Sequence, residues 1–147
     1  MTSPFGFKRA HDSPGFMLWQ TTTNWQKLIK EALTPYGISH SQFVIMAITH
    51  FHNIQDIKVH QSLISSFSKL DKMTISKNIK ELSRKALLEL REDASDSRAK
   101  NVKLTVDGQR LIQKLVPIVE KIDEEFFGKL GGKDQKSLLK MFGVLAK

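Results

Sequence analysis

Residues 61–84 read QSLISSFSKLDKMTISKNIKELSR, and this stretch predicts two short amphipathic helices. Its apolar side chains recur at helical spacing on either side of a short polar break: Leu63, Ile64 and Phe67 before it, and Ile75, Ile79 and Leu82 after it. Asp71 is well suited to begin the second helix, because its carboxylate can accept hydrogen bonds from the free N–H groups of a first helical turn. Two short helices joined by a tight turn are a helix-turn-helix candidate.

The sequence on the C-terminal side of this stretch changes from a helical period to a period of two. Apolar residues alternate with polar ones on both sides of the polar segment 92–100: Leu88 and Leu90 before it, and Val102 and Leu104 after it. Such alternation around a polar turn predicts a β-hairpin over residues 87–105, which would be the wing of a winged helix-turn-helix. A short extended piece is expected at 57–59, ahead of the first helix.

Residues 1–56 predict a flexible arm followed by two helices. The arm is residues 1–12, where phenylalanines are scattered among Gly and Pro. Two helices are expected after it: one from 13 to about 34, starting on the N-cap pair Ser13 and Pro14, and one over 39–52, starting on the capping box of Ser39 and Gln42.

Residues 106–147 predict a long helix, a break and a final helix. The stripe of the long helix contains Leu111, Leu115, Ile118, Ile122 and Phe126, and the glycine pair Gly131 and Gly132 ends it. The predicted fold is therefore mainly α with a small β-hairpin wing, in one domain over residues 13–147.

Length and composition exclude several classes of function. The chain has 147 residues, which leaves no room for a separate catalytic module, and it lacks a phosphate-binding glycine loop, a zinc-protease helix and a nucleophile motif. It contains no cysteine, so a disulfide, a thiolate metal site and a thiol redox switch are excluded. No apolar run is long enough to span a bilayer, and no secretory signal begins the chain, so we expect a cytoplasmic protein that is not an enzyme.

The net charge of +8 favours a polyanionic partner, and most of the excess lies in one region. Residues 57–105 contain 11 basic and 6 acidic side chains, whereas residues 1–56 contain 4 and 3, and residues 106–147 contain 8 and 6. The excess therefore coincides with the predicted winged helix-turn-helix, where contacts to DNA phosphates would be made.

Several of these residues together resemble the MarR family of bacterial transcriptional regulators. The resemblance rests on the segment 63–67, on Thr74, Ile75 and Leu82, and above all on the wing sequence REDASDSRAK at 91–100, which is followed by Leu104, Thr105 and Gly108. Asp96 and Arg98, spaced Asp-x-Arg, are similar to the wing signature of that family. Two positions differ from the family pattern, which usually has glycine in the turn and after the recognition helix, where this chain has Ser68 and Ala86.

The resemblance implies a homodimeric repressor on a palindromic operator in double-stranded DNA. Residues 57–105 would form the DNA-binding lobe, and residues 13–36 and 106–147 would be interlocking dimerisation helices. A recognition helix would enter each of two major grooves, with a wing tip in the flanking minor groove. Many such regulators release DNA when a small aromatic or phenolic ligand binds between the dimerisation helices and the DNA-binding lobe.

The residues expected to contact DNA lie on the second helix of the motif and on the wing. Thr74, Ser76 and Lys77 are candidates for reading base edges. Phosphate contacts are expected from Lys72, Lys80 and Arg84. The set also includes Met73 and Lys100. For the helix lysines the alternative is a solvated helix face. Arg98 is suited to a narrow minor groove, with Asp96 orienting it, and its alternative is a turn-stabilising ion pair.

The sequence also offers candidates for a ligand site. Trp19, Trp25, His40, Phe43 and Met46 could line an apolar cleft with a few polar groups, although each is also suited to a plain core. His50 and His52 are two residues apart and therefore on different sides of a helix, so no metal site and no cofactor are expected.

Three functions therefore stay open at this stage. The first is a ligand-responsive dimeric regulator, and the second is a DNA-binding regulator or architectural protein without small-molecule input. The third is a protein-interaction module that has lost DNA binding, for which the departures at Ser68 and Ala86 are the only indication.

Overall fold

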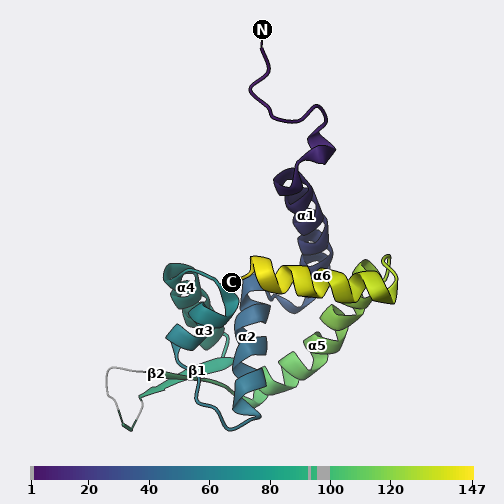
Figure 1. Cartoon of the computed structure of the whole chain (residues 1–147). Coiled ribbons are helices and arrows are strands. Elements are labelled where there is room, and N and C mark those ends of the chain that lie inside the picture. The colour runs from purple at the N-terminus through teal and green to yellow at the C-terminus, as the bar shows by residue number, and fades with distance from the viewer. Residues whose placement is uncertain (1, 93, 96–99) are drawn as a thin grey trace.

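The structure is a computed structural model, and it describes residues 2–92, 94–95 and 100–147. Within these residues the chain folds into six α-helices and one two-stranded antiparallel hairpin, as the sequence predicts (Figure 1). The elements are α1 (Pro14–Leu33), α2 (His40–Asn53), α3 (Gln61–Ser68), α4 (Lys72–Arg84), β1 (Leu88–Glu92), β2 (Lys100–Leu104), α5 (Val106–Phe127) and α6 (Gly132–Leu145), with single 3₁₀ turns at Ala10–Asp12 and Thr34–Tyr36.

The predicted helix starts are confirmed by side-chain caps. The hydroxyl of Ser13 accepts a hydrogen bond from the N–H of Phe16, and both bonds of the capping box between Ser39 and Gln42 are present. Thr105 caps α5 by accepting from the N–H of Gly108 at 3.0 Å, a start that the sequence analysis did not identify. Each cap satisfies a backbone donor that has no partner within its own helix.

The hairpin forms with the register that alternation predicts. Leu88 pairs with Leu104 and Leu90 with Val102, so the apolar side chains of both strands share the face toward the core. The extended piece at 57–59 lies along the other edge of β2, where the N–H of Val102 donates to the carbonyl of Val59 at 2.7 Å.

One continuous core joins the C-terminal part of α1 to α2, α3, α4, the hairpin and α5. The fully buried side chains include Ile29 and Leu33 of α1, Ile45 and Met46 of α2, Ile64, Ile75, Ile79, Leu82, Leu88, Ile112 and Leu115. We name the part formed by α2, α3, α4, the hairpin and the start of α5 the lobe.

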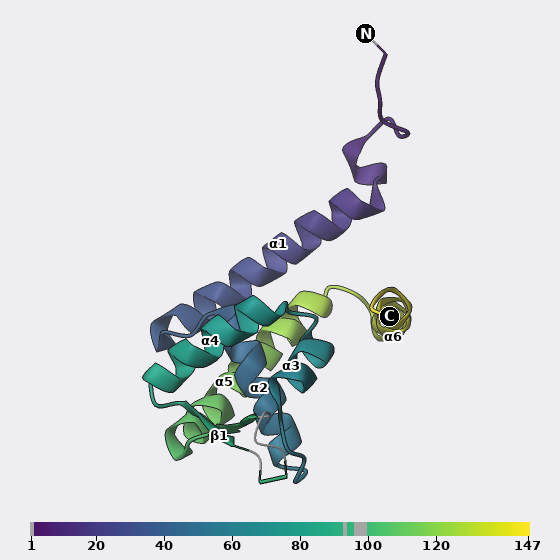
Figure 2. The ribbon, with the colours of Figure 1, turned by 90° about the vertical axis from the view of Figure 1, so that its left-hand side faces the viewer.

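The two ends of the chain extend away from this core. Figure 2 shows α1 rising diagonally from the lobe with the N-terminal arm at its far end, and α6 lying apart from the lobe. No residue of α6 is buried, although its sequence is rich in apolar side chains. None of the helices in the described residues has the length and apolar character needed to cross a membrane.

Candidate nucleic-acid interface

Helix α4 exposes one face along its whole length. Its opposite face, formed by Ile75, Ile79 and Leu82, is buried as predicted. Met73 is 84% exposed, and it lies in a shallow groove with Ser76, Lys77, Lys80, Glu81 and Arg84. A helix with three cations beside short polar and apolar side chains can contact both phosphates and base edges.

Thr74 is hydrogen-bonded to Asp71 in the first turn of α4. Its N–H donates to Oδ1 of Asp71 at 2.8 Å, and its hydroxyl donates to Oδ2 of the same carboxylate, also at 2.8 Å. The backbone hydrogen bond from Thr74, followed by its hydroxyl, lowers the pKa of Asp71. Thr74 therefore lies at the N-terminus of α4, and its hydroxyl proton is already donated to the Asp71 carboxylate.

The turn between α3 and α4 has its left-handed residue at Lys69, with φ of 64°. Ser68 bridges the turn, because its hydroxyl donates to the carbonyl of Ile64 at 2.6 Å and accepts from the N–H of Leu70 at 3.1 Å. The absence of glycine at position 68 therefore leaves the turn geometry intact.

The junction between α4 and the wing does contain a left-handed alanine. Ala86 has φ of 58°, the conformation in which glycine is favoured because it has no Cβ. Thr105 closes the base of the wing, since its hydroxyl donates to the carbonyl of Ala86 at 2.7 Å and its N–H donates to the carbonyl of Leu87 at 3.1 Å. A Cβ at Gly108 would lie 1.9 Å from the Leu87 carbonyl oxygen, so this position requires glycine.

Two residues of the predicted site are at the tip of the wing. Asp96 and Arg98 lie outside the described residues, and their expected roles stay predictions. Lys100 is described, and it is exposed at the start of β2. Three further basic residues, Lys58, Arg91 and Lys103, line a hollow between the extended piece and the hairpin. The regional charge counts included them, but no motif singled them out.

The five residues expected to line a ligand cleft do not come together as a set. Phe43 and Met46 are buried in the core, so the plain-core alternative is correct for both. Trp19 is 71% exposed on the N-terminal half of α1. Trp25 and His40 do meet, with ring centroids 5.0 Å apart in an edge-to-face arrangement.

Trp25 and His40 form a polar cluster with a third residue, Asp123 of α5. The indole N–H of Trp25 donates to Oδ1 of Asp123 at 2.7 Å. Burial lowers the pKa of His40, and the nearby Asp123 carboxylate acts against that shift. Sequence reasoning missed Asp123, which lies 98 residues from its tryptophan partner.

A cleft of about 570 Å³ opens beside this cluster, between α1, the start of α2 and the turn after α3. Its walls include Gln26, Lys30, Thr34, Gly37, Ile38, Ser39, His40, Ser41, Val44, Ser68 and Leu70. It therefore has one predicted residue, His40, and a lysine that could pair with an anion.

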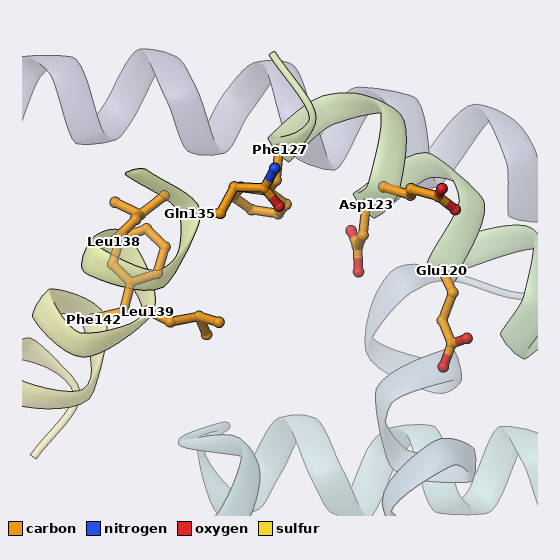
Figure 3. A pocket seen from close by; sticks show the side chains of 8 residues that line it. Glu120, Asp123, Phe127, Gln135, Leu138, Leu139 and Phe142 are labelled. Carbon is orange, nitrogen blue, oxygen red and sulfur yellow. The ribbon is translucent and has the colours of Figure 1, made fainter. Parts of the chain in front are cut away.

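A second hollow, of about 420 Å³, lies between α5 and α6. Figure 3 shows Phe127, Leu138, Leu139 and Phe142 on one side of it, and the carboxylates of Glu120 and Asp123 on the other. Its apolar side continues into the exposed residues of α6, including Leu139 at 71% and Leu145 at 76% exposure.

His52, near the end of α2, has a packing role. Nδ1 of the buried His52 is 2.7 Å from the carbonyl of Ile48, and its ring packs edge-on against Phe51 and Phe67. In the part of the chain that the structure describes, no group of three or more His, Asp or Glu side chains could hold a metal ion.

Comparison with known proteins agrees with this architecture. The model of the ArnR1-like winged-helix domain matches residues 34–121. The uncharacterized HTH-type transcriptional regulator YdcH of Bacillus subtilis (strain 168) is 34% identical over 121 residues, which are 82% of each chain.

Two solved structures have the same fold. BpsR of Bordetella bronchiseptica superposes with a TM-score of 0.87 at 20% identity, over 97% of this chain and 99% of that one. A mutant of MarR from E. coli, complexed with operator DNA, superposes with a TM-score of 0.80 at 17% identity, over 90% of this chain and 93% of that one.

These relatives are regulators of transcription and not enzymes. The family model covers the lobe and the flanking parts of the chain up to residue 121 of α5, which is more than half of the chain. The chain therefore belongs to the ArnR1-like winged-helix family, its relative YdcH is an HTH-type transcriptional regulator, and its fold is that of MarR.

Proposed function

We propose that this regulator binds a palindromic operator as a homodimer and reads it with the exposed face of α4. The observation that carries the proposal is the row formed by Met73, Lys77, Lys80 and Arg84, which faces outward along the whole helix. In this proposal Ser76 and Lys77 meet base edges, whereas Lys72, Lys80 and Arg84 meet phosphates. Such a protein works beside the chromosome, so we place it in the cytoplasm.

The wing would add contacts in the flanking minor groove. Lys100 is exposed at the start of β2, at the end of the hairpin farthest from Thr105, and it supports this role through its charge. Arg98, oriented by Asp96, is proposed as the residue inserted into the groove, on the basis of the wing signature alone. Arg91 and Lys103 extend the basic surface of the hairpin toward the DNA backbone.

The proposed dimer rests on the apolar side chains that one protomer leaves uncovered. Phe16, Leu18 and Trp19 on α1, and Leu139, Val144 and Leu145 on α6, are all exposed. Large apolar side chains left exposed on two neighbouring parts of a chain favour a protein interface when they gather into a patch. A second copy interlocking through α1, α5 and α6 would cover these residues and fill the hollow between α5 and α6.

We further propose that a small aromatic anion relieves DNA binding by occupying the cleft beside His40. The cleft offers the ammonium of Lys30 for a carboxylate, and the paired rings of Trp25 and His40 lie beside it. The similar BpsR is described as regulated in its DNA binding by 6-hydroxynicotinic acid, a ligand of this chemistry. The outcome of such control would be repression that the ligand lifts, and it requires tighter ligand binding to the DNA-incompetent state.

The first test is selection of the purified protein on random duplex DNA at near-physiological salt. We expect an enriched palindrome with half-sites about 34–36 Å apart, one helical turn. Lys77→Ala should relax the preference at specific positions, whereas Lys80→Ala should weaken all sequences about equally. Enrichment of no sequence, with only salt-sensitive background, would contradict the proposal and favour an architectural or protein-interaction role.

The ligand part of the proposal has its own test. Thermal unfolding with 6-hydroxynicotinic acid and other aromatic acids should raise the midpoint, because a ligand of the folded state stabilises it. Lys30→Met should remove that shift. If no aromatic acid shifts the midpoint or releases the selected operator, the alternative is correct, namely a DNA-binding regulator without small-molecule input.

A further inference from the structure

A buried amide connects the cleft to the DNA-binding side of the lobe. Gln42, in the first turn of α2, is only 4% exposed. Its side chain has four hydrogen-bond partners: Oε1 accepts from the Ser39 N–H (3.2 Å) and from Nζ of Lys85 (3.5 Å), and Nε2 donates to Oε2 of Glu81 (2.8 Å) and to Oδ1 of Asn78 (3.4 Å). One side chain thus caps its own helix and holds the recognition helix at two further positions.

The two ends of this network reach the two proposed binding sites. On one side, Ser39 lines the cleft, as does Gly37, whose carbonyl accepts a hydrogen bond from Nζ of Lys85 at 2.5 Å. On the other side, Glu81 lines the same groove as Lys77 and Arg84 on the exposed face of α4. A displacement of segment 37–41 would therefore move the hydrogen-bond partners of Gln42 and Lys85, the two side chains that link this segment to α4 and its C-terminal end.

Hydrogen bonds suit this task better than apolar contacts do. A buried amide that loses a partner leaves a donor or acceptor unsatisfied, so its geometry resists small displacements. The bond from Gln42 to the Glu81 carboxylate is charge-assisted and is the shortest of the four. Apolar contacts are non-directional, so they specify the relative position of two side chains less sharply.

We propose that Gln42 is the positioning residue that couples occupation of the cleft to the placement of the recognition helix. An occupant that displaces segment 37–41 strains the bonds from Gln42 to Glu81 and Asn78, and α4 shifts relative to α2. The inference rests on the proposed function, because it takes α4 as the helix that reads the operator. A coupling claim needs a measurement at both sites, which the following variants supply.

The first measurement compares two buried polar residues of α2. Gln42→Met keeps the length of the side chain and removes all four bonds, and Thr49→Val removes a buried hydroxyl that bonds only within its own helix, to the Ile45 carbonyl at 2.7 Å. Well below the unfolding midpoint, Gln42→Met should weaken binding to the selected operator about 10-fold, while Thr49→Val leaves it unchanged. If Gln42→Met lowers stability and leaves operator affinity as in the wild type, its role is structural only and the inference fails.

The second measurement uses the cysteine-free sequence to place an occupant in the cleft. Gln26→Cys, on the α1 side of the cleft, is labelled with N-phenylmaleimide, and Asn24→Cys, on the opposite side of the same helix, is the matched control. Labelling at position 26 should weaken operator binding about 10-fold when Gln42 is present, and less than about twofold in combination with Gln42→Met. Equal effects in both backgrounds would overturn the inference.

A failure of Gln42→Met to fold still leaves the coupling testable. Lys85→Met then replaces it, because Lys85 is exposed and its loss removes only the bonds to Gln42 and Gly37. This variant should weaken operator binding in the same direction, and unchanged affinity would count against the coupling. A wild-type protein that binds no operator overturns the proposed function and this inference together. A wild-type protein that binds its operator, with Gln42→Met binding equally well, overturns only the inference.

Discussion

Apolar side chains of the lobe form a buried core, whereas those of helix α6 are exposed or half-buried. In the lobe, the apolar faces of α2, α3, α4 and the hairpin are buried against one another within one chain. Helix α6 has a comparable apolar content, yet none of its residues is buried. We infer that the lobe is complete in one protomer, whereas α6 acquires a core only from a second copy. The two regions should therefore respond differently to substitution.

The largest effect is expected from emptying the core of the lobe. Ile79→Ala deletes a side chain that is 1% exposed on the inner face of α4. Loss of burial and the remaining cavity should lower the free energy of unfolding by about 2–5 kcal/mol. Urea unfolding at several protein concentrations measures this, with Ile54→Ala, at an exposed position of the lobe, as the control. A loss below about 1 kcal/mol would show that the lobe is loosely packed.

The next largest effect is expected on dimer affinity, from a substitution in α6. Leu145→Asp places a charge on an exposed apolar position that a dimer would bury. Self-association should weaken at least about 10-fold, because burial of a leucine side chain is worth about 1.5–3 kcal/mol. Sedimentation equilibrium measures the dissociation constant. Ile54→Asp, at an exposed position of the lobe, is the matched control, and equal dimer affinity in both variants would place the interface elsewhere.

A smaller effect, in the stabilising direction, is expected at Ala86. Its left-handed backbone is unfavourable for any residue with a Cβ, so Ala86→Gly should raise the free energy of unfolding by about 0.5–1 kcal/mol. The same substitution at Ala32, inside α1, should lower it by a similar amount. Thermal unfolding of the two variants compares them directly. A loss of stability on Ala86→Gly would mean that the methyl group contributes packing that outweighs the strain.

The smallest effect is a pH dependence at the boundary between the lobe and α1. Burial lowers the pKa of His40 from its ordinary value of 6.5, so below that pH the unfolded chain binds a proton more readily than the folded one. The stabilising contribution is therefore complete above about pH 6.5 and is lost as the pH falls toward the lowered pKa. His40→Gln should reduce the change of the thermal unfolding midpoint with pH between pH 7.5 and about 5. An unchanged slope would assign the pH dependence to other groups, and the exposed His11 provides the control substitution.

Local patterns identified the elements of this fold. The caps at Ser13, Ser39 and Asp71 were predicted because each acts over only three residues of chain, and the wing was predicted because alternation marks a strand directly. The outward face of α4 followed from its apolar stripe for the same reason. The left-handed residue at Lys69 was not predicted, because a lysine gives no local signal for that conformation.

Side chains a few positions apart were enough to specify the helix-turn-helix, the wing and the outward face of its second helix. The packing of the folded chain was needed to assign Phe43 and Met46 to the core, and to bring Trp25 and His40 to Asp123. It also revealed that Gln42, a recognisable cap, holds Glu81, 39 residues away. Such partners are set by the packing of helices distant along the chain, and no local period encodes which side chains face each other across that packing.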